Sequence, residues 1–84
     1  MSNIKIYGKE NCSYCTRAKE LLNSYNLEYD YFSLGTDLTV DELIESFPTA
    51  KTVPIVVINN KWIGGYNELE TYIEETMNNY GHPI

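Results

Sequence analysis

The sequence predicts an α/β fold in which a central four-stranded mixed sheet is flanked by helices. Strand-like alternation and helical spacing follow one another along the chain in the order β-α-β-α-β-β-α. The opening β-α-β unit predicts a right-handed crossover and therefore a parallel pair of strands. An Asn-Asn pair before the last strand predicts an antiparallel hairpin. Because 84 residues are too few for two cores, we expect one domain over 1–84.

The first strand and the first helix are predicted from a change of period near the N-terminus. Residues 4–7 alternate between apolar and polar positions, which is typical of a strand. Across residues 12–25 the apolar side chains recur at steps of three and four, which predicts an amphipathic helix of about three turns. Asn11 is expected to cap the start of this helix. Asn26 is expected to end it, since Asn tolerates the left-handed conformation.

A second strand and a short second helix are expected in the middle of the chain. Residues 28–32 alternate again and predict the strand. Thr39 and Glu42 have the spacing of a capping box, and Leu38 and Leu43 have that of a hydrophobic staple. Pro48 is expected to stop the helix. The predicted apolar face of the helix consists of Leu43, Ile44 and Phe47.

The C-terminal part predicts a hairpin followed by a last helix. Residues 55–58 are all apolar, as expected of a strand covered on both faces, and the return strand spans 61–63. Gly64 and Gly65 end the hairpin, and Asn67 is expected to cap the helix. The expected apolar positions of this helix are Leu69, Tyr72, Ile73, Met77 and Tyr80, and residues 81–84 are expected to form a frayed tail.

Charge and hydropathy exclude several classes of function. The formal net charge of −6 argues against nucleic acid as a partner, because binding to phosphates relies on Lys and Arg. Residues 1–26 nevertheless hold four cations against two carboxylates, so the positive part of the chain is also the part with the cysteines. No apolar run is long enough to span a membrane. The N-terminus does not resemble a signal peptide, so we expect a cytoplasmic protein.

The two cysteines are the candidate catalytic residues. Cys12 and Cys15 lie three positions apart, so a disulfide between them closes almost no loop and would stabilise the fold little. At a strand-to-helix junction, unpaired N–H groups and the helix dipole stabilise the thiolate of the first cysteine, and Lys9 and Arg17 add positive potential. We therefore expect Cys12 to attack a disulfide and Cys15 to resolve the mixed disulfide.

Zinc binding is the structural alternative for this Cys-x-x-Cys motif. A tetrahedral site needs four ligands, and the chain offers only the two cysteines and His82 in the tail. We therefore expect no metal site within one chain, while metal ligation shared between two copies stays open.

With these residues identified, the chain resembles a glutaredoxin of the thioredoxin-fold superfamily from about Ile4 to Met77. The resemblance depends on three separated motifs, Cys-Ser-Tyr-Cys at 12–15, Thr-Val-Pro at 52–54 and Gly-Gly-Tyr-Asn at 64–67. It implies a thioredoxin-like fold and a glutathione-dependent thiol–disulfide oxidoreductase that serves electron transport and redox homeostasis. The substrates implied are protein disulfides and glutathione mixed disulfides.

The resemblance also implies a glutathione site. In the family the Thr-Val-Pro proline is cis, the residue before it pairs with the cysteinyl part of glutathione, and the Gly-Gly motif approaches the γ-glutamyl end. Basic residues meet the glycine carboxylate, and an aromatic residue between the cysteines shapes the groove. Carried over, the site consists of Lys9, Tyr14, Lys51, Thr52, Val53, Pro54, Gly64, Gly65, Tyr66 and Asn67. Each of these positions also has a purely structural explanation. Pro54 could simply open a strand, and the two glycines could end a hairpin that needs positive φ. The two lysines could be solvated surface charges, and Tyr14 could pack on its helix face.

Two positions depart from the family pattern. Asn67 stands where many relatives have Asp or Ser, which removes a charge for the ligand's ammonium. Ser13 stands where most dithiol relatives have proline, and some relatives with this substitution bind a [2Fe–2S] cluster between two monomers. The alternatives to the leading function are therefore a cluster-binding carrier or sensor and a dithiol donor reduced by thioredoxin reductase. The resemblance suggests ribonucleotide reductase as one electron acceptor; we expect a monomer, with neither nucleic acid nor membrane as partner.

Overall fold

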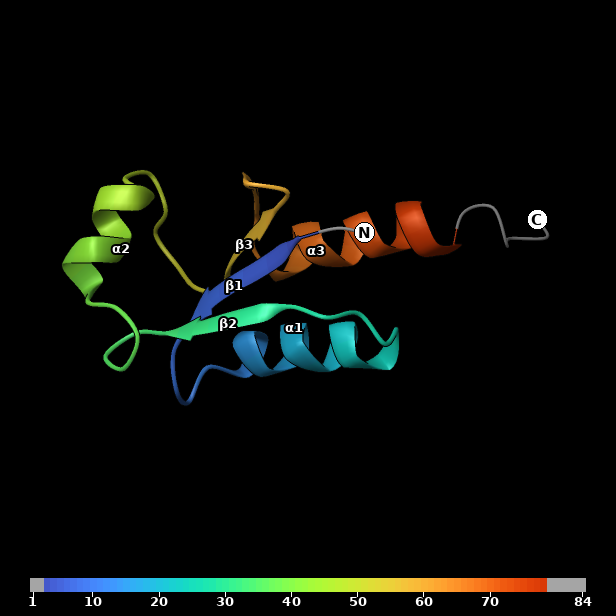
Figure 1. The fold of residues 1–84 in the computed structure, drawn as a ribbon, viewed down its shortest axis with the longest axis horizontal. Helices are drawn as coiled ribbons and strands as arrows, with labels where there is room; N and C mark the ends of the chain where they lie inside the picture. Colours follow the sequence, from blue (N-terminus) through green and yellow to red (C-terminus); the bar gives the residue numbers. More distant parts are fainter. Residues whose placement is uncertain (1–2, 79–84) are drawn as a thin grey trace.

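The protein has a four-stranded mixed sheet in the strand order β2-β1-β3-β4 (Figure 1). The computed structural model describes residues 3–78. The strands are β1 Ile4–Gly8, β2 Asp30–Ser33, β3 Ile55–Ile58 and β4 Lys61–Gly64, and the helices are α1 Ser13–Ser24, α2 Val40–Ser46, α3 Tyr66–Ile73 and the π-helix η1 Glu74–Asn78. β1 pairs with β2 in parallel and with β3 antiparallel, and β3 and β4 form a hairpin. The predicted fold class is confirmed.

The start of α1 differs from the prediction. Asn11 has a positive φ of 59° and lies before the helix, whereas Cys12 is the N-cap. The Sγ atom of Cys12 accepts a hydrogen bond from the backbone N–H of Cys15 at 3.2 Å. The prediction that Asn11 caps this helix was wrong, because the Cys12 sulfur accepts the hydrogen bond that a side-chain oxygen usually accepts at the N-cap.

The end of α1 is as predicted. Asn26 has a φ of 58°, and its N–H donates to the carbonyl of Asn23. The N–H of Leu27 donates to the carbonyl of Leu22, which completes the hydrogen-bond pattern of a Schellman motif. The following strand, β2, begins at Asp30 rather than at residue 28, because its ladder with β1 starts at Lys5.

The helix α2 begins with the predicted capping box. Thr39 Oγ1 accepts from the N–H of Glu42 at 3.1 Å, and the N–H of Thr39 donates to Glu42 Oε1 at 2.8 Å. Leu38 and Leu43 pack in the same apolar cluster, as a hydrophobic staple requires. Placing Ile44 on the buried face was wrong, since 52% of its surface is exposed. The helix makes less than two full turns, so its only buried side chain is Leu43.

The hairpin confirms the predicted turn. Asn59 and Asn60 have φ values of 53° and 66°, as a two-residue turn with two left-handed residues requires. All four residues of β3 are buried, and they alternate between the two sides of the sheet. β3 is therefore covered on both faces.

The start of α3 also differs from the prediction. The N-cap is Gly65, and Asn67 lies inside the first turn, so the prediction of an Asn67 cap was wrong. The N–H of Gly65 donates to Oε1 of Glu68 at 2.8 Å, which is one half of a capping box; glycine has no side chain to supply the other half. After Ile73 the helix continues as the π-helix η1 instead of a regular α-helix. The side chain of Met77, Tyr80 and the 81–84 tail lie outside what the structure describes.

The two faces of the sheet are covered unequally. One face packs against α1 and α3 in a cluster of buried side chains: Ile4, Ile6, Ala18, Leu22, Val56, Ile58, Leu69 and Ile73. The other face carries a smaller cluster of Leu43, Ile55 and Val57. Figure 1 shows α2 at the end of the sheet toward which β1 and β2 run, whereas α1 and α3 lie along the strands. Within the described residues, no helix has both the length and the apolar character needed to cross a bilayer.

Candidate functional site

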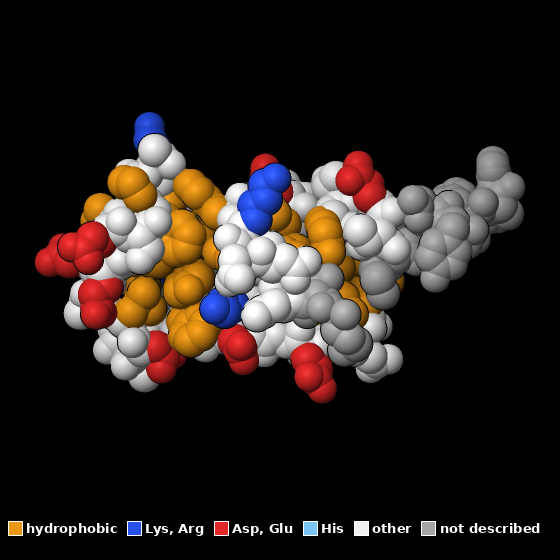
Figure 2. All heavy atoms as spheres, turned by 45° about the horizontal axis from the view of Figure 1, so that its top comes forward, with side chains coloured by type: hydrophobic (Ala, Val, Ile, Leu, Met, Phe, Trp, Pro, Cys, Tyr) orange, Lys and Arg blue, Asp and Glu red, His pale blue; other side chains and the backbone are white. Residues whose placement is uncertain are grey.

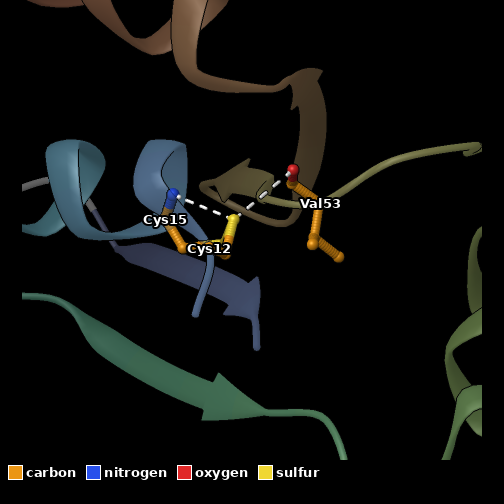
Figure 3. Close-up of a disulfide and its surroundings, with 3 residues drawn as sticks. All are labelled: Cys12, Cys15 and Val53. Atoms are coloured by element: carbon orange, nitrogen blue, oxygen red, sulfur yellow. Dashed lines mark hydrogen bonds between the residues drawn. A yellow bond between two sulfur atoms is a disulfide. The ribbon is translucent and has the colours of Figure 1, made fainter. Parts of the chain in front are cut away.

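The two cysteines form a disulfide at the start of α1 (Figure 3). Their Cα atoms lie 5.2 Å apart, within the usual range for a disulfide. Cys12 is partly exposed, whereas only 1% of the Cys15 surface is exposed. An incoming thiol or thiolate therefore has access to Cys12, and Cys15 is protected beneath the first turn.

The carbonyl group of Val53 faces the sulfur atom of Cys12. The Sγ of Cys12 lies 3.9 Å from this oxygen, and the two residues are 41 positions apart in the sequence (Figure 3). The peptide bond between Val53 and Pro54 is cis, as expected from the Thr-Val-Pro motif. The loop before β3 thus reaches the reactive sulfur through its backbone.

A first groove lies between this loop and the N-terminus of α3. We call it the α3 groove; it has a volume of about 430 Å³ and is lined by Tyr14, Thr52, Val53, Pro54, Gly65, Tyr66, Asn67 and Glu68. All but Glu68 are residues that the sequence motifs single out. The backbone on its two sides is close, because a Cβ added to Gly65 would lie 3.2 Å from the Pro54 carbonyl. The groove therefore brings the three separated motifs to one place.

Arg17 packs against two aromatic residues that line the α3 groove, a contact that the sequence analysis did not predict when it assigned Arg17 a positive potential near Cys12. Its guanidinium carbon lies 5.1 Å from the ring centre of Tyr14 and 4.8 Å from that of Tyr66. The two rings are 5.8 Å apart and tilted. Cation–π contacts of this kind stabilise an aromatic wall. The spacing of Arg17 from Tyr14, one helical turn, is the signal that could have indicated this role.

Glu68 lines the α3 groove and was not among the site residues predicted from the sequence. Its Oε1 is bound to the N–H of Gly65, and its side chain lies against Gly64, where an added Cβ would be 2.5 Å from Glu68 Cγ. Gly64 has a φ of 134°, a conformation that favours glycine. The Glu68 carboxylate therefore lies at the start of α3, and Glu68 lines the same groove as Asn67. The Gly-x-x-Glu spacing was the available signal, since Glu is favoured three residues after a cap.

A second groove lies on the other side of Val53. We call it the α2 groove; its volume is about 230 Å³, and it is lined by Lys9, Val40, Leu43, Ile44, Phe47, Ala50, Lys51, Thr52, Val53 and Ile55. Lys9 and Lys51 therefore lie along this groove and do not line the α3 groove with the other predicted site residues. Thr52 and Val53 line both grooves. The two grooves meet at the loop that faces Cys12.

A tyrosine lies behind the disulfide. A Cβ added to Gly8 would overlap the Tyr31 hydroxyl and lie 2.9 Å from Cys15 Sγ, so these two groups share the space that Gly8 leaves. The Nζ of Lys19 lies 4.3 Å from the centre of the Tyr31 ring. Burial raises the pKa of Tyr31, and the neighbouring Tyr29 raises it further.

Comparison with known proteins gives a consistent result. A family model described as Glutaredoxin matches residues 4–63. Hybrid peroxiredoxin hyPrx5 of Haemophilus influenzae is 37% identical over 83% of this chain, which spans only 29% of that protein. Glutaredoxin 3 of Escherichia coli (strain K12) is 35% identical over 82% of this chain and 83% of its own length.

A solved structure supports the same assignment. The crystal structure of the buckwheat glutaredoxin–glutathione complex superimposes with a TM-score of 0.73 at 26% identity, covering 90% of this chain and 73% of that one. With a Cys-x-x-Cys disulfide at the start of α1 and a family match over most of the chain, the protein belongs to the glutaredoxin family of thiol–disulfide oxidoreductases.

Proposed function

We propose that the protein reduces protein disulfides and glutathione mixed disulfides and that reduced glutathione recharges its dithiol. The observation that carries the proposal is the partly exposed Cys12 sulfur beside the Val53 carbonyl, where the α3 groove meets the α2 groove. The α3 groove, which residues of the three family motifs line, has room for a peptide-sized ligand. The buckwheat relative supports glutathione as this ligand, since it was solved as a complex with it.

The catalytic roles follow from accessibility and the position of the helix. The Cys12 thiolate attacks one sulfur of the substrate disulfide, forms a mixed disulfide and expels the other sulfur as a thiolate. The N–H of Cys15, which already donates to Cys12 Sγ, and the N-terminus of α1 stabilise the Cys12 thiolate. Cys15 then loses its proton and attacks Cys12, which releases the reduced substrate and forms the disulfide seen in the structure.

Glutathione closes the cycle. One glutathione thiolate attacks Cys12 and frees Cys15, and a second attacks the resulting mixed disulfide, leaving the dithiol and glutathione disulfide. We place the γ-glutamyl carboxylate at the N-terminal amides of α3, and its ammonium at the Glu68 carboxylate. The glycine carboxylate points toward Lys9 and Lys51 at the α2 groove. The cytoplasm is the compartment that supplies reduced glutathione.

The test is turnover of a glutathione mixed disulfide in two coupled assays, one with glutathione and its reductase and one with thioredoxin reductase. We expect turnover in the first assay. Turnover in the second alone would contradict the proposal. Cys12→Ser should abolish activity in both, and substantial residual activity would remove Cys12 from the role of nucleophile.

The matched variant Cys15→Ser separates the two steps. It should retain reduction of small glutathione mixed disulfides, because free glutathione resolves that intermediate, and it should lose most reduction of protein disulfides. Equal loss of both activities would contradict the proposed role of Cys15 as the resolving cysteine.

A further inference from the structure

The α2 groove exposes apolar side chains beside the reactive cysteine. Val40 is 56% exposed and Ile44 is 52% exposed, and both line the groove with the more buried Leu43 and Phe47. Figure 2 shows hydrophobic side chains gathered in a continuous, hollowed area on the side of the molecule where α2 lies. Apolar surface of this kind in water is typical of a site that binds a partner.

The fold itself does not require these side chains to be apolar. The helix α2 buries Leu43 alone, and the capping box at Thr39 and Glu42 fixes the start of the helix without Val40 or Ile44. Polar residues at both positions would leave the core beneath them unchanged. Their apolar character is therefore better explained by an occupant of the groove.

The charges around the groove indicate the chemistry of that occupant. Lys9 and Lys51 line it and are exposed, in a chain whose net charge is −6. The acidic residues of α2, Asp41, Glu42 and Glu45, do not line the groove, and Figure 2 shows acidic side chains around the outer edge of the apolar area. An occupant with apolar and acidic side chains fits this pattern, because the lysines would pair with its carboxylate.

The position of the groove indicates which segment of a substrate it can reach. Val53 lines both grooves, and its carbonyl lies 3.9 Å from Cys12 Sγ. A substrate cysteine bonded to Cys12 therefore has one groove on each side. In the proposed placement of glutathione, the γ-glutamyl group fills the α3 groove and the glycine points toward Lys9 and Lys51. Residues that follow the cysteine in a protein substrate would then enter the α2 groove.

We propose that the α2 groove binds the segment that follows the disulfide cysteine of a protein substrate, with preference for a bulky apolar side chain followed by a carboxylate. The inference rests on the proposed function, which sets the direction of the bound chain. The apolar side chain packs between Ile44 and Phe47, and the carboxylate pairs with Lys51 and Lys9. The α2 groove thereby distinguishes one protein substrate from another by the residues that follow the disulfide cysteine.

The test is a single-turnover reaction of the reduced Cys15→Ser variant, which stops at the mixed disulfide. Each short acetylated peptide carries one cysteine bonded to thionitrobenzoate. The Cys12 thiolate attacks the peptide sulfur, the S–S bond to the aryl group breaks, and yellow thionitrobenzoate leaves with the electron pair. The peptides are a Cys-Leu-Asp peptide, a Cys-Ser-Lys peptide and a reversed Asp-Leu-Cys peptide of equal length. The same aryl disulfides of glutathione and of N-acetylcysteine amide serve as references.

We expect the Cys-Leu-Asp peptide to react about tenfold faster than the Cys-Ser-Lys and reversed peptides, because burying one leucine in part is worth about that factor. In the Cys15→Ser background, Val40→Ser with Ile44→Ser should remove most of this preference and leave the rate with the glutathione disulfide unchanged. Lys51→Gln should slow the Cys-Leu-Asp peptide, whereas Lys61→Gln, a matched exposed lysine outside both grooves, should not.

Two results would overturn different parts of the scheme. Equal rates for the three peptides, or a preference that survives the Val40→Ser and Ile44→Ser double change, would overturn the α2 groove as a docking site. If glutathione's aryl disulfide reacted no faster than that of N-acetylcysteine amide, the proposed glutathione site would fail instead. Faster reaction of the reversed peptide would overturn the proposed direction of the bound segment.

Discussion

The two faces of the sheet differ in how completely they are packed. Among the described residues, the face under α1 and α3 holds a cluster of eight buried side chains, and the face toward α2 holds a cluster of three. The first face fixes the N-termini of α1 and α3, which carry Cys12 and Gly65. The second leaves apolar side chains of α2 in water. The well-packed face therefore positions the cysteine and the start of α3, whereas the less packed face carries the groove that we propose binds protein substrates.

The largest expected effect is on the free energy of unfolding, and a matched pair of core truncations measures it on the two faces. Leu22→Ala removes a side chain with 0% exposure from the larger cluster, and Leu43→Ala removes one with 7% exposure from the smaller cluster. We expect losses of unfolding free energy of about 4 kcal/mol and about 2 kcal/mol, because the site beside an open groove can relax. Urea unfolding followed by circular dichroism measures both. Equal losses would show that the two faces are equally well packed.

Gly8→Ala tests the tight packing of the first face directly behind the disulfide. The added methyl group would overlap the Tyr31 hydroxyl and crowd Cys15 Sγ, so we expect a loss of about 1–3 kcal/mol in unfolding free energy. Tyr31→Phe removes the overlapping oxygen and keeps the ring. The double variant should therefore recover part of the loss in a double-mutant cycle. Full additivity of the two changes would mean that these groups do not compete for the same space.

Thr39→Ala sharpens the comparison on the second face. It removes the hydroxyl that caps α2, which typically costs about 1 kcal/mol. Because α2 buries one side chain, we expect local fraying of the helix rather than global unfolding. Amide hydrogen exchange should accelerate in α2 and stay unchanged in α1. Thr71→Ala on the exposed side of α3 is the control, and a uniform acceleration through the sheet would contradict the prediction.

The smallest expected effect is a pH dependence from Tyr31. Burial first, and the neighbouring Tyr29 second, raise the pKa of Tyr31 above its ordinary value of 10.0. Folding then favours the neutral phenol, so its contribution to stability is fully present below pH 10.0 and is lost as the pH rises through the folded-state pKa. In the oxidised protein, where the cysteines do not titrate, stability should fall more steeply above this pH than in Tyr31→Phe. Identical slopes would contradict the shift.

Several local features of the fold could be predicted because they depend only on residues that are close together in the sequence. The capping box of Thr39 and Glu42, the left-handed Asn59-Asn60 turn and the end of α1 at Asn26 are all as predicted. Each depends on hydrogen bonds or φ values within a few residues. The Cys-x-x-Cys motif likewise indicates its own chemistry, because the two sulfur atoms are placed by a single helical turn.

Other features were decided only when distant segments packed together. Sequence patterns put Ile44 in the core, but the short α2 at the end of the sheet leaves it exposed. The motifs did not reveal that Lys9 and Lys51 line a different groove from Gly65, or that the Glu68 side chain would line the α3 groove opposite Pro54. Periodicity specifies which side of an element is apolar, but only the three-dimensional packing of α2, α3 and the Val53 loop determines where solvent-filled grooves remain between them.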